Sequence, residues 1–144
     1  MERFGGTSEV DLIDLVVAGE RSRNSFDAIQ AEQMLTYVDR ARVAGEAFAG
    51  AQAGRLEVSA ATHELSLAVM LPVGTIEQQL AMTRRVRSTM PGLWAGWHAG
   101  DVSTRKVGLA DQAAQRFTQP ISVSMLDAII VEVAARKTPG QLRS

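Results

Sequence analysis

Cysteine does not occur in the 144-residue sequence, and histidine occurs only twice. Without cysteine the chain has no disulfide, no thiolate zinc site and no cysteine nucleophile, and it is indifferent to the redox state of its compartment. His63 precedes Glu64 as in a zinc-protease helix, but Leu67 stands where the second histidine of that motif belongs. We therefore expect no metal, no cofactor and no catalytic residue in this chain.

Long apolar runs and nucleotide-binding motifs are missing as well. The longest apolar run, LSLAVMLPVGTI at residues 65–76, is broken by Pro72 and Gly74 and is shorter than the roughly 20 residues that span a bilayer. The stretch MERFGGTSEVDLIDLVVAGE carries acids throughout its apolar part, unlike a signal peptide, and GGTSEV lacks the Gly-Lys-Ser/Thr ending of a phosphate-binding loop. These absences predict a cytoplasmic protein without a membrane partner.

Charge is divided unevenly along the chain, whose net charge is −1. Residues 1–72 hold 6 Lys/Arg against 11 Asp/Glu, whereas residues 73–144 hold 9 Lys/Arg against 5 Asp/Glu. A basic half attracts phosphate groups and an acidic half repels them, but a surplus of this size also occurs on ordinary solvated helices. The charge pattern leaves both interpretations open.

Aromatic residues make up only 5% of the sequence, and apolar residues recur every three or four positions. This spacing places apolar side chains on one face of a helix and does not fit the alternation of a strand. No linker or low-complexity tract divides the chain. We therefore predict an all-α protein, a single multi-helix domain over residues 1–144 with about six or seven helices.

The first predicted helix begins after Thr7 or Ser8, which are suitable capping residues, and ends near Gly19. We expect its buried stripe to consist of Val10, Ile13, Val16 and Val17.

The second predicted helix covers residues 25–49, with Asn24 and Asp27 forming its cap and Gly50 and Gly54 ending it. Its expected apolar face consists of Phe26, Ile29, Met34, Leu35, Val38 and Phe48.

The remaining helices are expected over residues 59–70, 75–90, 93–98, 103–117 and 124–137. In LPVG, residues 71–74, Pro72 restricts the preceding residue and Gly74 permits unusual dihedral angles, so a turn is expected there. The expected buried positions in the first two of these helices are Ala61, Leu65, Ala68, Val69, Ile76, Leu80, Thr83 and Val86.

The stretch GLWAGWHAGDVSTRK predicts a joint between two helices. Gly92, Gly96 and Gly100 recur every four residues, which lets one face of a short helix approach a neighbour closely. Gly100 suits the end of that helix, and Asp101 or Ser103 suits the start of the next. A lone His98 with no acid and nucleophile at a matching spacing is interpreted as structural.

The sequence ELSLAVMLPVGTIEQQLAMTRRVRSTMPGLWAGWHAGDVSTRKVGLADQAAQRF resembles the signature region of domain of unknown function 222, a family of actinobacteria and actinophages. That family has an E-L-A-L-A-L helix, a second helix with an Arg-rich end, a leucine-rich turn and an aGeIs segment. The corresponding segments here are residues 64–70, 75–87, 93–100 and 100–103. The later AARKTPGQLRS resembles the exit of the domain, so the resemblance covers about residues 56–144, and residues 8–50 fit its looser amino-terminal helices.

The resemblance implies an association with HNH endonucleases, because family members commonly carry that nuclease domain downstream. The nuclease pattern of His, Asn and His residues with zinc-binding cysteines is absent from this chain. In KTPGQLRS, Thr138 is suited to cap a helix and Pro139 to be its first residue. We therefore expect the chain to stop inside an element that continues in a longer protein.

A helix-turn-helix is also predicted by the length of the segment and by the turn residues at its middle, in the sequence ELSLAVMLPVGTIEQQLAMTRRVR. In that interpretation Thr75, Gln78 and Gln79 lie at the start of a DNA-facing helix, where glutamine can pair with adenine. Phosphate contacts would then come from arginines and lysines: Arg84, Arg85, Arg87, Arg105 and Lys106, with Arg136, Lys137 and Arg143 joining them if the fold permits. Glu77 reduces the positive charge of the first turn.

Two functional hypotheses follow. The first is a non-catalytic DNA-binding or regulatory module of an HNH-endonuclease-type protein, with double-stranded DNA as its partner. The second is a phage- or prophage-type protein-interaction or oligomerisation module that binds a host protein or another copy of itself. The acidic amino-terminal half and two tryptophans expected to be exposed, Trp94 and Trp97, favour the second.

Overall fold

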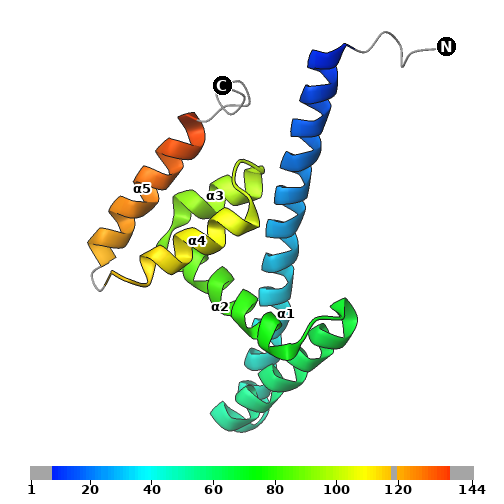
Figure 1. Ribbon diagram of the computed structural model, residues 1–144. Coiled ribbons are helices and arrows are strands. Elements are labelled where there is room, and N and C mark those ends of the chain that lie inside the picture. Colours follow the sequence, from blue (N-terminus) through cyan, green and yellow to red (C-terminus); the bar gives the residue numbers. More distant parts are fainter. Residues whose placement is uncertain (1–7, 118–119, 137–144) are drawn as a thin grey trace, which may run out of the picture. The chain divides into compact units, whose positions relative to one another are not determined.

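The structure, a computed structural model, describes residues 8–117 and 120–136, and within these ranges it contains five helices and no strand. They are α1 (Glu9–Val69), α2 (Val73–Thr89), α3 (Pro91–Ala99), α4 (Thr104–Ala114) and α5 (Pro120–Arg136), shown in Figure 1. The all-α prediction is confirmed. The described chain has fewer helices than the six or seven predicted, because segments assigned to three separate helices form the single element α1.

The predicted boundary between the first two helices was wrong. Gly19 lies inside α1, where one glycine costs a helix only about 1 kcal/mol. Asn24 caps nothing, because its Nδ2 donates a hydrogen bond to the Gly100 carbonyl oxygen 3.1 Å away. The predicted end of the second helix at Gly50 is confirmed: the helical dihedral angles of α1 are interrupted at Ala49 and Gly50, and the φ of 84° at Gly50 is a conformation that glycine adopts readily.

Other predicted helix ends are confirmed by their hydrogen bonds. The Asp11 N–H donates to Ser8 Oγ at 3.2 Å and the Ser8 N–H donates to Asp11 Oδ2 at 3.3 Å, a reciprocal cap at the start of α1. Gly100 ends α3 in the left-handed conformation, with φ of 88°, and Ser103 Oγ accepts from the Lys106 N–H at the start of α4. The GLWAGWHAGDVSTRK stretch is thus a helix-to-helix joint.

The chain divides into two compact units. We call residues 29–89 the hairpin unit, because they contain the two arms of α1 on either side of Gly50, followed by α2. We call the described residues on either side of it, 8–28, 90–117 and 120–136, the split unit.

The hairpin unit is held by an apolar core and a close approach of its two α1 arms. Its core consists of Met34, Leu35, Val38, Ala61, Ile76 and Leu80. A Cβ on Gly45 would lie 2.7 Å from the Ala53 carbonyl oxygen, so only glycine fits there without movement. Gly54, predicted as a helix end, instead lies buried within the second arm. The four predicted buried positions of α2, namely Ile76, Leu80, Thr83 and Val86, are confirmed.

Between α1 and α2 the positive φ falls on Met70, at 59°, and Gly74 lies within α2. The Leu71 N–H donates to the Ser66 carbonyl oxygen at 3.1 Å, which closes the end of α1. The predicted turn is confirmed, but the residue with unusual dihedral angles is Met70.

The split unit is built around Trp97 and joined to α1 by polar contacts. Its buried apolar residues are Ala28, Met90, Leu93, Trp97, Val102, Val107, Ala110 and Ala114. Asn24 and Ser25 of α1 donate hydrogen bonds to the carbonyl oxygens of Gly100 and His98, and Arg21 pairs with Asp101. Polar groups, rather than a continuous apolar stripe, therefore fix α1 in this unit.

From α5, Asp127 reaches the start of α3 in the same unit. Its two carboxylate oxygens accept from the Gly92 and Leu93 N–H groups at 3.0 and 2.8 Å. Met90 provides no side-chain cap there, so this distant carboxylate satisfies the helix start. Each of the three glycines at four-residue spacing has a close neighbour: Val131 and Asp127 beside Gly92, Val102 beside Gly96 and Arg21 beside Gly100.

Several residues expected in the core are exposed. Val10, Ile13 and Val16 are exposed, as are Phe26, Ile29 and Phe48. The expectation failed because three- or four-residue spacing identifies one face of a helix but not whether another element covers it. In the described part of the chain, no helix combines the length and apolarity needed to cross a membrane.

Candidate functional site

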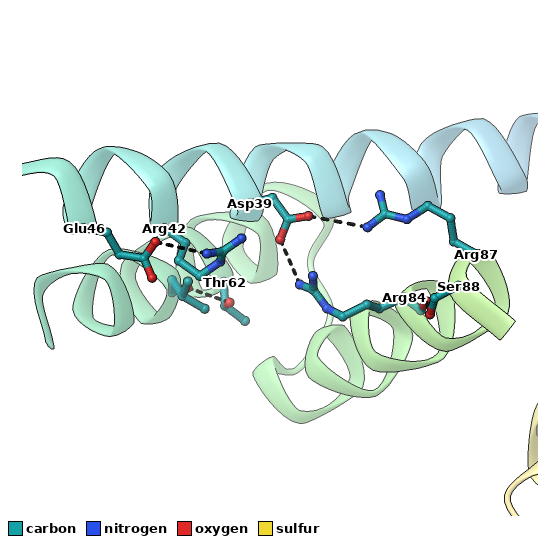
Figure 2. Close-up of polar contacts among 8 residues, drawn as sticks. Asp39, Arg42, Glu46, Thr62, Arg84, Arg87 and Ser88 are labelled. Atoms are coloured by element: carbon teal, nitrogen blue, oxygen red, sulfur yellow. Dashed lines mark hydrogen bonds and ion pairs between the residues drawn. The ribbon is translucent and has the colours of Figure 1, made fainter. Parts of the chain in front are cut away.

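Two of the arginines predicted to contact phosphate, Arg84 and Arg87, face an acidic side chain. Arg84 Nη2 lies 2.9 Å from Asp39 Oδ1, and Arg87 Nη2 lies 3.8 Å from Asp39 Oδ2. Figure 2 shows both guanidinium groups, carried by α2, turned toward this α1 carboxylate. The carboxylate offsets part of their positive charge, so the surface attracts an anion less than three unpaired arginines would. Arg85 is half-buried.

The predicted base-contacting residues lie on the first turns of α2. Gln78 and Gln79 are exposed, and Thr75 is half-buried. Exposed Glu77 precedes the two glutamines, so an acid lies beside them. The helix-turn-helix interpretation and the DNA contacts of these residues stay predictions.

Arg105 and Lys106 are exposed on the first turn of α4. They belong to the split unit, whereas Thr75, Gln78, Gln79 and the α2 arginines belong to the hairpin unit. Of the further basic residues, Arg136 is the last residue of α5. Lys137 and Arg143, like the predicted cap at Thr138 and Pro139, lie outside the described residues.

The tryptophans expected on the surface are largely covered. Trp97 is 1% exposed, and its Nε1 donates to Thr104 Oγ1 at 3.2 Å. Trp94 is half-buried, with its ring centroid 4.2 Å from that of His98. His98 Nδ1 also lies 2.9 Å from the Trp94 carbonyl oxygen one turn earlier. The prediction of two exposed tryptophans was wrong because Trp97 fills the core of the split unit, and the structural interpretation of His98 fits these contacts.

Exposed large apolar side chains, not anticipated from the sequence, lie on α1 within each of the two units. In the split unit, Leu15, Val16 and Phe26 are 63%, 72% and 72% exposed. In the hairpin unit, Ile29, Tyr37 and Val43 are 42%, 44% and 57% exposed. Large apolar side chains are commonly exposed singly, but a succession of them along one helix is typical of a contact surface.

Two shallow depressions lie along the first α1 arm of the hairpin unit. One, of about 540 Å³, is lined by Ile29, Glu32, Gln33, Thr36, Tyr37 and Arg40. The other, of about 420 Å³, is lined by Thr36, Asp39, Arg40, Val43, Ala44 and Ala47. We call the residues of both together the α1 face. The spacing of residues 29, 33, 36, 40, 43 and 47, alternately four and three apart, is the signal that could have identified it.

At the edge of the α1 face, Tyr37 connects the two arms of α1. Its hydroxyl donates to Glu64 Oε2 on the second arm. The pKa of Tyr37 is raised above 10.0. The largest cause is this hydrogen bond, and desolvation and the negative charge of Glu64 make smaller contributions. The contact holds an exposed aromatic ring in the lining of the first depression.

No group of three or more metal-binding side chains occurs in the described ranges. Comparison of the chain with known protein families, curated proteins and solved structures finds no match. The resemblance to domain of unknown function 222 accordingly stays a prediction.

Proposed function

We propose that this chain is a protein-interaction module that associates with a second copy of itself through α1. The observation that carries the proposal is the succession of exposed apolar side chains on that helix in both units. The proposal retains the self-partner form of the second functional hypothesis but assigns it to α1 in place of the tryptophans.

The amino-terminal end of α1 gives the strongest physical argument. Residues 9–20 are helical, yet every one of them is exposed except half-buried Val17. Most helices in proteins are stabilised by packing of an apolar face, and this part of α1 has almost none of its side chains covered. The segment VDLIDLVV provides such a face, and a second helix packed on it would stabilise it.

A second copy suits this surface because charges of both signs accompany it. Glu20 and Arg23 lie on α1 in the split unit, 3.2 Å apart, and Glu32 and Arg40 lie on the α1 face. A partner of one dominant charge would be attracted by some of these residues and repelled by others. Two identical mixed surfaces can instead pair opposite charges.

Sedimentation velocity across a concentration series tests the proposal. We expect the sedimentation coefficient to rise with concentration to that of a dimer. The double substitution Leu15→Gln and Val16→Gln should shift the transition to higher concentration, because it removes apolar contact area while keeping helix-compatible side chains.

The matched control is Leu67→Gln, which changes an 80% exposed leucine of the second α1 arm. It should leave the transition unchanged. A wild-type chain that stays monomeric at every concentration would contradict self-association. An equal shift in the control would show that general surface apolarity, and not this part of α1, is responsible.

The exposure of Gln78 and Gln79 at the start of α2 favours a second candidate function, a DNA-binding or regulatory module. In this hypothesis Asp39 limits phosphate binding by pairing with Arg84 and Arg87. Fluorescence anisotropy of a labelled random duplex at low and moderate salt tests it. Binding should weaken with salt, strengthen in Asp39→Asn and weaken when both arginines are replaced by glutamine. Absence of binding at low salt in both the wild type and Asp39→Asn would exclude this function.

A further inference from the structure

The amino-terminal end of α1 in the split unit carries charge of one sign. Residues 9–20, which we call the acidic segment, hold four acids and no lysine or arginine. Arg21 and Arg23 follow this segment, but each is paired with a carboxylate of its own chain. Negative charge therefore surrounds the exposed apolar side chains of this segment, which include Leu15 and Val16.

The outward side of α4, in the same unit, carries the opposite charge. Arg105, Lys106 and Arg116 are exposed, whereas Asp111, the one acid of α4, is buried. Leu109 lies one turn after Arg105 and is 55% exposed. The first turn of α4 holds Arg105 and Lys106 and no acid, and the helix dipole is also positive there. We call these exposed residues the α4 face: Arg105, Lys106, Leu109, Arg116 and Phe117.

Within one copy the acidic segment and the α4 face do not cover each other. Every residue of the segment except half-buried Val17 is exposed, and so is every residue of the α4 face. Among the described residues, the side chains of Glu9, Asp14, Arg105 and Arg116 make no hydrogen bond or ion pair. The chain thus carries both sides of a complementary contact without joining them, and a second copy provides the side that each one lacks.

We infer that the acidic segment of one copy docks on the α4 face of a second copy, and that the second copy docks on the first in the same way. The inference rests on the proposed self-association and specifies what α1 meets. The contact covers Leu15 and Val16 and sets them against Leu109 and Phe117. A two-fold axis repeats the contact, so each dimer contains it twice.

The two surfaces agree in length as well as in charge. Residues 9–20 form about 18 Å of helix and the 11 residues of α4 form about 16 Å, so the two helices can lie side by side over their full lengths. Two acidic segments docked on each other would instead bring two sets of four carboxylates together, and these repel. The charges therefore favour α4 over a second α1 end.

Reversing the unpaired charges of each surface in turn tests the contact. The α1 variant is Glu9→Lys/Asp14→Lys, which leaves Asp11 free to cap the helix with Ser8. The α4 variant is Arg105→Glu/Arg116→Glu. Each variant alone should show a dimer dissociation constant raised about tenfold or more, because like charges then meet in both contacts of its dimer.

An equimolar mixture of the α1 variant and the α4 variant should recover association as a heterodimer, since both of its contacts again join opposite charges. Native mass spectrometry identifies the heterodimer by its mass, and sedimentation velocity gives the affinities. The chain with all four substitutions should associate about as well as the wild type, because the charges of both surfaces are exchanged together.

Three further variants complete the experiment. Leu109→Gln should raise the dissociation constant severalfold without changing any charge, because it removes apolar area that meets α1. Glu77→Lys and Arg55→Glu reverse exposed charges of the hairpin unit and should leave association unchanged. Circular dichroism of each variant checks that the helices are retained.

The outcomes distinguish failure of this inference from failure of the proposed function. A monomeric wild type overturns both. A wild type that dimerises while the α4 variant keeps its affinity overturns only the inference, and so do weakened variants that form no heterodimer when mixed. Loss of duplex DNA binding in the α4 variant, with dimerisation unchanged, also overturns it and assigns the α4 face to DNA.

Discussion

The hairpin unit and the split unit fix their helices by different means. In the hairpin unit, the two arms of α1 follow one another directly and pack through an apolar core and a close approach at Gly45. In the split unit, α1 reaches segments more than 70 residues later, through hydrogen bonds from Asn24 and Ser25 to backbone carbonyl oxygens. An apolar core therefore joins the helices of the first unit, whereas in the second unit polar side chains of α1 meet backbone groups in one defined geometry.

The largest expected effect is the loss of the polar joint on replacing Gly100 by alanine. The new Cβ would collide with the Arg21 carbonyl oxygen, and the φ of 88° is unfavourable for any residue with a Cβ. We expect a loss of about 2–4 kcal/mol in the free energy of unfolding, measured by urea denaturation followed by circular dichroism. Hydrogen exchange should show the loss in the split unit, with protection of residues 29–89 preserved.

Gly19→Ala is the matched control for that substitution. A Cβ at Gly19 meets no atom within 4 Å, and the residue lies within α1. The change should raise stability by about 0.5–1 kcal/mol through helix propensity. Similar effects of the two substitutions would contradict a role for the close contact between Gly100 and Arg21.

Gly45→Ala applies the same test to the hairpin unit. Its Cβ would lie 2.7 Å from the backbone oxygen of Ala53, which cannot move without separating the two arms. The collision destabilises the fold, and the higher helix propensity of alanine offsets part of that effect. We therefore expect the free energy of unfolding, measured by urea denaturation, to fall by about 1–2 kcal/mol. In this variant, protection from hydrogen exchange should decrease within residues 29–89. Equal loss of protection in both units would show that they unfold as one, and would remove the contrast drawn between them.

The smallest effect concerns the contact between Tyr37 and Glu64. Because the pKa of Tyr37 is raised in the folded protein, this contact stabilises the hairpin unit below pH 10.0 and is lost as the pH rises through the higher, folded value. Ultraviolet absorbance of the single tyrosine gives its titration midpoint directly. Glu64→Gln should lower that midpoint, while Glu77→Gln on α2 should not. An unchanged midpoint in Glu64→Gln would refute the assigned cause.

Local features were predictable from the sequence. The caps at Ser8 and Ser103 and the helix end at Gly100 use side chains or backbone freedom within a few residues. The buried positions of α2 followed from their spacing. Both kinds of prediction depend only on interactions within one helix or its immediate flank, which the residue order specifies.

Features that depend on distant partners were not predictable. Arg84 and Asp39 are 45 residues apart, so the sequence around α2 gave no indication that a carboxylate would meet its arginines. Asn24 looked like a helix cap because its preferred local role is capping, but a carbonyl group 76 residues later provided a partner within a continuous helix. The exposure of Val16 and Phe26 likewise depended on which elements pack against α1.

The insertion of the hairpin unit between the halves of the split unit sets an order for folding during synthesis. A ribosome releases the chain from its amino end, so residues 29–89 are complete before any carbonyl group that Asn24 or Ser25 contacts has been made. Contacts between near neighbours also form faster than contacts that close a long loop. The amino-terminal end of α1 is therefore made before the hairpin unit but fixed in place after it, and its apolar side chains are exposed to water in the meantime, where a chaperone can reach them.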